Sequence, residues 1–311
     1  MGTNQLAIIK EETVDAVARR IGVLQNSREL HLPATYSAQN ALKSAWLILQ
    51  EVVDKAGAPA LSVCTRESIM NSLLDMVIQG LNPAKKQCYF VVFGKKLVLM
   101  RSYFGSIAVA KLVDPDIEDV VGETIYEGDK FKYQIRRGKK EITEHEQEFG
   151  SVDKKKIIGA YAEVIDREGK VKATEILTID EIYQSWKRSK MNPFDEQGKV
   201  KSGSTHGKFT SDMARRTAIN KVCKLIINSS NDSQILSQAV SRAADEMSRA
   251  EAEEQIKERA NKGPVVDIDH GDPVDADFEE VQGAEDLPHA NGSDIPLKTE
   301  SERPAEGDAP Y

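Results

Sequence analysis

The chain has 311 residues, of which 40% are hydrophobic and 30% charged, and its formal net charge is -8. This composition is that of an ordinary soluble protein with a sizeable core. The three cysteines are odd in number and far apart, which excludes a disulfide framework or a zinc knuckle. No run approaches about eighteen apolar residues and the N-terminus lacks a signal pattern, so we expect a cytoplasmic protein without membrane contact.

The first predicted elements are helices. Apolar residues recur at helical spacing after Ser37, and again after Thr65, and both residues are candidate N-caps. Gly80 is the natural stop of the second helix. The chain therefore begins its ordered part with at least two helices, each with one buried stripe.

The pattern then changes to period two. Residues 87–93 and 96–101 are rich in β-branched and aromatic side chains, and Gly94 between them suits a type II′ turn. We expect a β-hairpin here. Residues 102–113 resume helical spacing, with Ser102 as the candidate cap.

The second half returns to strands and then to helices. Residues 119–149 and 156–178 alternate like a meander of three to five strands, and helical patterns follow at 179–188, 209–230 and 233–262, with a polar loop at 189–208. This order predicts an α+β fold: a central antiparallel hairpin and meander packed by helices, and a long basic helix after the sheet. The expected divisions are 1–34 (an N-terminal segment and subunit contact), 35–228 (the main core), 229–263 (a charged helix) and 264–311 (a tail).

The negative charge is concentrated in that tail. Residues 264–311 hold 14 Asp and Glu against two bases and almost no periodic apolar residues, so we expect a disordered acidic segment. Subtracting it leaves 40 bases and 36 acids, so the folded part is mildly basic. Residues 85–111 hold six bases and no acid, and residues 187–224 hold ten bases and three acids, on either side of a more acidic middle.

The chain has no familiar catalytic motif. It lacks a phosphate-binding loop, a dinucleotide fingerprint, a nucleophile elbow and a zinc-protease helix. Paired carboxylates at Asp114 and Asp116, and at Asp267 and Asp269, could serve a metal nuclease. The first pair more simply ends a helix, and the second lies in the tail. We therefore expect no enzyme activity, no cofactor and no metal site.

Clustered bases with interleaved aromatic side chains favour nucleic-acid binding, because phosphates need cations and unstacked bases need flat surfaces. The first basic block places Tyr103 and Phe104 beside Arg101, and the second places Trp186 and Phe209 beside lysines. Many of these aromatics serve the core instead. We assign Phe104 and one face of the hairpin to the core, and Trp186 fits either role.

The bases of the long helix cannot all face one way. At about 100° per residue, Lys208 and Arg215 fall within about 20° of each other, whereas Arg216 is about 100° from Arg215, and Lys221 and Lys224 lie on another side. Two interpretations stay open. Either the helix is embedded, with one arginine on DNA and its neighbour tied to protein carboxylates, or part of the basic set is ordinary surface.

Two stretches carry recognisable motifs. In "MVIQGLNPAKKQCYFVVFGKKLVLMRSYFGSIAVAK" a helix ends in Gly-Leu-x-Pro, a hairpin follows, and Tyr-x-Gly-x-Ile leads a helix. "FTSDMARRTAINKVCKLI" contains a Met-Ala-basic-basic-Thr run. Both resemble the signatures of the RecT family of phage single-strand annealing proteins. The resemblance covers roughly residues 35–260. The sequence departs from the family at Val92 and Phe93, where a proline and a tyrosine are usual, which concerns the hairpin rather than the function.

The resemblance implies ATP-independent annealing of complementary DNA strands in phage recombination inside a bacterial host. It implies binding of single-stranded DNA and of the annealed duplex, assembly into a ring or helical filament, and partnership with a phage exonuclease and a host single-strand-binding protein. A passive single-strand-binding protein is the alternative, and a metal-dependent nuclease a weaker one. The expected DNA-binding residues are Arg101, Tyr103, Lys111, Lys208, Phe209, Arg215, Arg216, Lys221 and Lys224, with Lys187, Arg188 and Lys190 added on charge alone.

The acidic tail has three candidate roles. It could compete with DNA for the binding groove, dock a host single-strand-binding protein, or confer solubility. We expect truncation after Lys262 to leave annealing intact.

Overall fold

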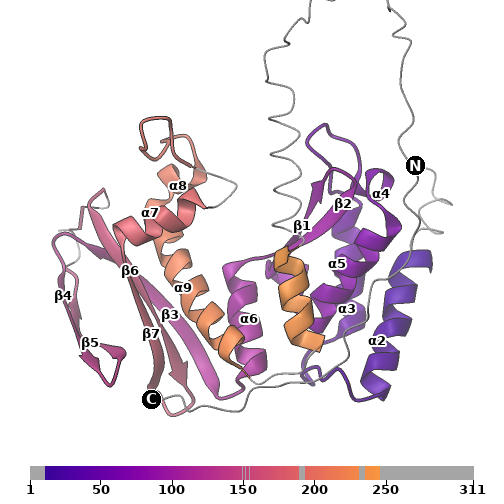
Figure 1. Cartoon of the computed structure of the whole chain (residues 1–311), viewed down its shortest axis with the longest axis horizontal. Helices are drawn as coiled ribbons and strands as arrows, with labels where there is room; N and C mark the ends of the chain where they lie inside the picture. The colour runs from indigo at the N-terminus through magenta and orange to yellow at the C-terminus, as the bar shows by residue number, and fades with distance from the viewer. Residues whose placement is uncertain are drawn as a thin grey trace, which may run out of the picture. The chain divides into compact units, whose positions relative to one another are not determined.

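Helices and antiparallel strands follow one another along the chain, which confirms the predicted α+β fold class (Figure 1). The computed structural model describes residues 11–148, 150, 152–153, 155–188, 193–230 and 235–245. These residues belong to a compact unit that runs from Met1 to Gly263. The acidic tail from Pro264 lies outside the described residues.

The N-terminal part is helical, and both predicted caps are confirmed. The Ser37 hydroxyl accepts a hydrogen bond from the backbone N–H of Asn40, and the Thr65 hydroxyl accepts one from that of Ser68. Gly80 has a φ of +65° just beyond the second capped helix, as a C-terminal glycine does. The elements are η1 (Glu11–Asp15), α2 (Ala16–Asn26), α3 (Ala38–Leu49), α4 (Ala60–Val63), α5 (Arg66–Ile78) and η2 (Pro83–Lys85).

The predicted hairpin is also present. β1 (Cys88–Phe93) pairs antiparallel with β2 (Lys96–Arg101), and the φ of +58° at Gly94 fits the type II′ turn. Phe90 is buried in the core while Tyr89 on the opposite face is exposed. Alternation along β1 therefore separates a core face from a solvent face.

The predicted meander contains five strands, but they form two sheets. β3 (Ile117–Tyr126), β6 (Ile157–Asp166) and β7 (Val171–Thr178) make an antiparallel sheet in the order β3-β6-β7. β4 (Lys130–Arg136) and β5 (Lys139–Glu146) form a separate two-stranded ribbon between β3 and β6 in the sequence. The ribbon is separate because β3 pairs directly with β6, and no residue of β4 or β5 is buried.

The remaining helices pack on the three-stranded sheet or on one another. They are α6 (Tyr103–Val113), α7 (Ile179–Lys187), α8 (Thr205–Lys208) and α9 (Thr210–Ser229). α9 packs on β3 and β6 and also against α6, and small buried residues on it, Ala214 and Ala218, permit this close approach (Figure 1). None of the described helices is both long and apolar enough to cross a membrane.

Part of the predicted charged helix is integrated into this unit. Residues 235–245 are helical, with Leu236 and Ala239 buried in the main core. Arg242 binds the nearly inaccessible carboxylate of Asp75 on α5, with Nη2 at 2.6 Å from Oδ1 and Nε at 3.1 Å from both oxygens. Because a buried unpaired carboxylate is strongly destabilising, this pair fixes the helix to α5.

Two predictions about side chains are wrong. The sequence predicts Phe104 in the core, but 46% of it is exposed, because the neighbouring Tyr103 takes the inward position. The sequence also predicts Lys208 on the long helix, but it ends the short α8, and Phe209 with φ of -127° and ψ of 48° breaks the helix before α9. The angle calculated between Lys208 and Arg215 therefore does not apply.

Candidate nucleic-acid interface

The site begins where β2 passes into α6. Ser102 caps α6 by accepting a hydrogen bond from Gly105 N–H, and its hydroxyl donates to the Lys86 carbonyl at 2.7 Å. A Cβ on Gly105 would lie 2.1 Å from the Gln87 carbonyl oxygen. Only glycine fits so close an approach, which explains the glycine of the Tyr-x-Gly-x-Ile motif. The turn fixes the direction in which Tyr103 and Phe104 project.

Two aromatic rings and a guanidinium form a layered cluster at this point. The Tyr103 and Phe104 ring centroids are 4.0 Å apart, and the Arg216 Cζ lies 5.1 Å from the Tyr103 ring centroid. Arg216 comes from α9, more than a hundred residues later in the chain. Its Nε is buried and has no hydrogen-bond partner among the described residues. We call Tyr103, Phe104 and Arg216 the stacking cluster.

Arg101 is the last residue of β2, two residues before Tyr103 of this cluster. Its Nη1 donates a hydrogen bond to Oε1 of Gln79 at 3.0 Å, and burial lowers the pKa of its guanidinium. Gln79 is itself 1% exposed. Arg101 therefore joins β2 to the end of α5 in the structure, and a contact with phosphate would need it to turn outward.

A second group of predicted residues gathers at the N-terminal end of α9. Trp186 of α7 is buried, donates through Nε1 to the Thr217 hydroxyl at 2.9 Å, and packs edge-on against His206 of α8. Trp186 thus holds α7 and α8 against α9 and is a core residue. The predicted DNA-binding residues on α7 and α8, and directly after each of these helices, are exposed: Lys187, Arg188, Lys208 and Phe209.

The sequence left open whether the bases of α9 are embedded in the fold or lie on an ordinary surface, and the structure contains both kinds. Arg215 pairs with Asp212 at 3.1 Å, and Lys221 pairs with Glu175 of β7 at 2.9 Å. Arg216 stacks on an aromatic ring, and Lys224 is exposed. Arg215 and Arg216 are half-buried, with one arginine tied to a carboxylate and its neighbour in the stacking cluster, whereas Lys221 and Lys224 are exposed.

Lys111, another of the predicted residues, stands apart from these groups. Lys111 is at the far end of α6, where its Nζ donates to the Glu118 carbonyl at 2.5 Å and lies 3.8 Å from Asp119. Lys190 lies outside the described residues. No contact among the described residues brings Lys111 next to the stacking cluster.

The carboxylates considered for a metal nuclease have another partner. Asp114 and Asp116 both bind the Lys172 ammonium, at 2.7 and 2.9 Å. A lysine thus occupies the place that a metal would take between them. Within the described ranges there is no group of three or more His, Cys, Asp or Glu side chains suited to a metal ion. Asp267 and Asp269 lie outside those ranges.

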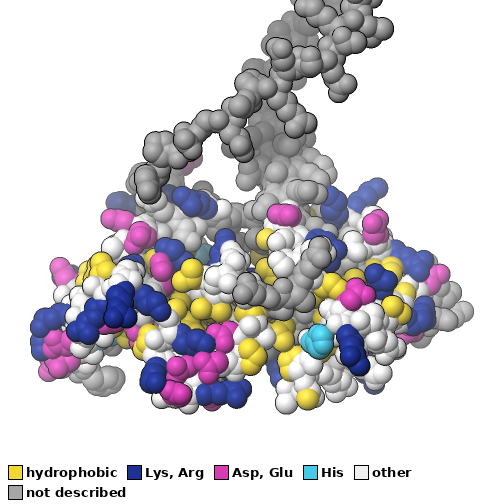
Figure 2. Space-filling view, turned by 60° about the horizontal axis from the view of Figure 1, so that its bottom comes forward, with side chains coloured by type: hydrophobic (Ala, Val, Ile, Leu, Met, Phe, Trp, Pro, Cys, Tyr) yellow, Lys and Arg dark blue, Asp and Glu magenta, His cyan; other side chains and the backbone are white. Residues whose placement is uncertain are grey.

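Sequence reasoning missed one basic feature. Residues 130–140, "KFKYQIRRGKK", hold six bases and no acid, but they lie in a middle region that is acidic when its charge is averaged. In the structure they are β4 and the turn into β5. The ribbon lies at the left of Figure 1, and Lys and Arg side chains gather at the left of the face seen in Figure 2. Charge counted in short windows would have found this segment.

Comparison with protein families gives a match to the RecT family model over residues 39–261. The match covers most of the chain and includes both motifs. The chain belongs to the RecT family. Comparison with curated proteins gave no match. Membership in the RecT family places the protein among the phage single-strand annealing proteins, which bind DNA and act in recombination.

Proposed function

We propose that this RecT-family protein anneals complementary DNA strands without ATP, as an oligomer that holds each strand by its backbone. Binding through phosphates and base faces leaves the hydrogen-bonding edges of the bases free to find a partner strand. Annealing requires this freedom, and it requires no nucleotide hydrolysis. The proposal assigns the positions in the stacking cluster and along α7, α8 and α9 to contact with single-stranded DNA and with the annealed duplex.

One observation carries the proposal: the two family motifs meet in space. The first motif supplies Tyr103 and Phe104 at the start of α6, and the second supplies Arg216 on α9, which packs against α6. A guanidinium over one ring beside a half-exposed second ring offers both a cation for phosphate and a surface for base stacking. From Arg215 to Lys224 the helix also spreads bases over about 14 Å, at about 1.5 Å per residue.

An annealing assay tests the function directly. Complementary oligonucleotides, one with a fluorophore and one with a quencher, are mixed with the protein in the presence and absence of ATP and magnesium. We expect pairing to be faster with the protein under all four conditions, and DNA binding to weaken steeply with salt. Binding without faster pairing would support the passive single-strand-binding alternative, and strands shortened in magnesium would support the nuclease.

Arg216 provides the matching residue-level test. Arg216→Ala removes a cation and the guanidinium plane, so we expect DNA affinity to fall by about tenfold, or about 1.4 kcal/mol. Arg216→Lys should restore little, because an ammonium does not stack as a guanidinium does. Arg167→Ala, at an exposed arginine of the β6–β7 turn, is the control. Equal affinity for all four proteins would remove Arg216 from the site.

The tail and the partners remain part of the proposal. The family match ends at residue 261, so we expect truncation after Lys262 to leave annealing in vitro intact. Loss of annealing would place the end of the core further along the chain. We expect the tail or the core to meet a phage exonuclease and a host single-strand-binding protein, which co-precipitation with full-length and truncated protein would distinguish.

A further inference from the structure

The β4–β5 ribbon has two different faces. On one face, lysines of β4 pair with glutamates of β5: Lys132 lies 2.8 Å from Glu144, and Lys130 pairs with both Glu144 and Glu146. On the other face, Phe131 stacks on Tyr161 of β6 at the base of the ribbon. Further toward the turn this second face is open, with Tyr133 48% and Ile135 66% exposed. The second face of the ribbon is therefore covered at its base and exposed toward the turn.

The turn at the tip contains an arginine in an unfavourable backbone conformation. Arg136 pairs with Lys139, so Arg137 and Gly138 are the two central residues, with φ of +50° and +77°. Positive φ at both positions is the pattern of a type I′ turn, which prefers Asn or Asp followed by Gly. A side chain as long as arginine is uncommon there. A residue that weakens its own turn is a sign that the side chain serves something other than folding.

The charge of the tip is largely uncompensated. Arg136 lies 3.5 Å from Glu141, and Lys140 donates to the Ile176 carbonyl at 3.0 Å. Arg137 and Lys139 are exposed and form no ion pair with any residue in the described part of the chain. The lysines at the base of the same ribbon are neutralised by glutamates. The unpaired cations are therefore confined to the turn.

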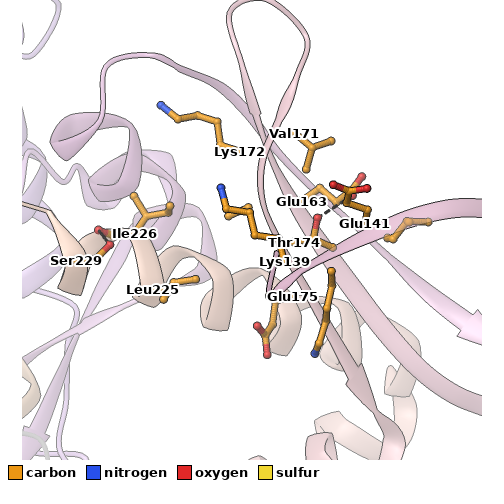
Figure 3. Close-up of a pocket in the computed structure, with 14 residues that line it drawn as sticks. Lys139, Glu141, Glu163, Val171, Lys172, Thr174, Glu175, Leu225, Ile226 and Ser229 are labelled. Carbon is orange, nitrogen blue, oxygen red and sulfur yellow. Dashed lines mark hydrogen bonds between the residues drawn. The ribbon is translucent and has the colours of Figure 1, made fainter. Parts of the chain in front are cut away.

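The tip also lies beside the proposed binding helix. An open pocket is lined by residues 138–142 of the ribbon, residues 171–175 of β7, and Leu225, Ile226 and Ser229 in the last turns of α9. Figure 3 shows Lys139 among these residues, between β7 and the end of α9. Lys224 is next to Leu225 in the sequence and is exposed. The tip thus lies beside the last turns of α9, which also carry Lys224.

We propose that the β4–β5 tip, through Arg137 and Lys139, is a second contact with the DNA backbone. This inference rests on the proposed function and adds a site to it. Glu141, Glu163 and Glu175 line the neighbouring pocket, but Arg137 and Lys139 form no ion pair with them, so these two exposed cations suit phosphate oxygens. The neighbouring exposed Ile135 and Tyr133 provide an apolar surface for a sugar or a base. A contact with another copy of the protein would pair these two cations only if that copy placed carboxylates opposite them, whereas every stretch of DNA backbone offers phosphates.

The test uses a double charge reversal in the full-length chain. The variant Arg137→Glu, Lys139→Glu is compared with Arg167→Glu, Lys170→Glu, which makes the same charge change at the β6–β7 turn, where Lys170 already pairs with Glu168. Affinity for a labelled single strand and for the annealed duplex is measured over a range of salt concentrations. We expect the tip variant to bind at least one of these DNAs about tenfold more weakly than the control variant. The slope of its affinity against salt should fall by about 0.7 for each phosphate that the tip no longer binds.

Arg137→Asn separates folding from binding. Asn is favoured at this turn position, so we expect the melting temperature to stay equal or rise while DNA affinity falls about threefold, and Arg137→Lys should retain affinity. Equal affinity and salt slope for the tip and control double variants would overturn the inference. So would loss of oligomer assembly by the tip variant in the absence of DNA, which would indicate a subunit contact. Failure of the proposed function itself would show differently, as wild-type protein that does not accelerate annealing.

Discussion

The hairpins β1–β2 and β4–β5 have similar outlines in the sequence and opposite roles in the fold. Both are short antiparallel pairs with a two-residue turn rich in Lys, Arg and Gly. In β1–β2, Phe90 and Leu97 to Leu99 are buried in the main core. In β4–β5 no residue is buried. The local pattern predicts a hairpin in both cases, but burial decides whether the hairpin builds the core or projects from it.

The two hairpins are also fastened differently. The β1–β2 hairpin is bound to α5 along its length: Ser72 Oγ donates to the Leu97 carbonyl at 2.8 Å, and Thr65 N–H donates to the Lys95 carbonyl, also at 2.8 Å. The β4–β5 ribbon is held at its base around the Asp129 carboxylate, and nearer the turn by Lys140, which donates to the Ile176 carbonyl of β7. The first hairpin therefore has little freedom to move independently, whereas the turn of the second presents the exposed Arg137 and Lys139 to a ligand.

Truncation of one aromatic residue in each hairpin should give the largest difference. Phe90→Ala removes a ring that is 6% exposed, and we expect it to lower the free energy of unfolding by about 3–5 kcal/mol. Tyr133→Ala, at a ring that is 48% exposed, should cost less than about 1 kcal/mol. Urea denaturation followed by circular dichroism measures both. Similar losses would mean that the ribbon is packed as firmly as the first hairpin.

The base of the ribbon offers the next test. Asp129 accepts hydrogen bonds from Tyr126 N–H at 2.8 Å, from Gln147 at 3.1 Å, and contacts His145 Nε2 at 3.2 Å. Asp129→Asn should therefore destabilise the ribbon by about 1–3 kcal/mol. Hydrogen exchange should show faster exchange in β4 and β5 with little change in β1 and β2. Equal acceleration in both hairpins would show that the ribbon does not open separately.

The same carboxylate gives the ribbon a dependence on pH. Burial raises the pKa of Asp129, but the hydrogen bonds from Tyr126, Gln147 and His145 outweigh it, so its pKa lies below the ordinary value of about 3.9. A carboxyl group with a lowered pKa stabilises the fold above its unfolded pKa and ceases to do so as the pH falls through its folded pKa. We expect ribbon amides to exchange faster than β1–β2 amides, beyond the intrinsic effect of pH, below about pH 4. Asp129→Asn should abolish that difference.

Exchanging the turn chemistry should have a smaller and opposite effect in the two hairpins. Gly94→Arg places a side chain at φ of +58° and should cost about 1 kcal/mol. Arg137→Gly removes a side chain from φ of +50° and should stabilise the turn by a few tenths of a kcal/mol, partly offset by the greater freedom of glycine in the unfolded chain. Urea denaturation of both variants measures whether the free energy of unfolding falls or rises in each. A loss of stability in Arg137→Gly would show that the arginine side chain supports the turn.

Local patterns were sufficient to predict much of this fold. The caps at Ser37, Thr65 and Ser102 and the turn at Gly94 depend on neighbours within a few residues, and the structure contains them as predicted. The division of five strands into two sheets depends on which distant strands pair, and periodicity carries no such information. Individual elements could therefore be predicted more reliably than their assembly.

The candidate site shows the same limit. The sequence identified Tyr103 and Arg216 as candidates, but their stacking across more than a hundred residues, and the pairing of Lys221 with Glu175, are tertiary contacts. The basic tip at Arg137 is visible as a short acid-free window and disappears when charge is averaged over a longer region. Charge therefore has to be counted in windows about as long as one hairpin turn with its flanking residues, because a basic patch of this size comes from a single turn.

The charged face of the ribbon should give the smallest effect. Glu144 pairs with Lys130 and Lys132, and their hydrogen bonds lower the pKa of its carboxyl group. Glu144→Gln breaks both pairs, but such pairs at a surface are weak and screened by salt. We expect a slight loss of stability at low salt that disappears in high salt, and stronger DNA binding through Lys132, because Lys130 keeps Glu146 as a partner. Unchanged DNA affinity would mean that phosphates reach the tip of the ribbon and not its base, which would confine the second contact to the turn.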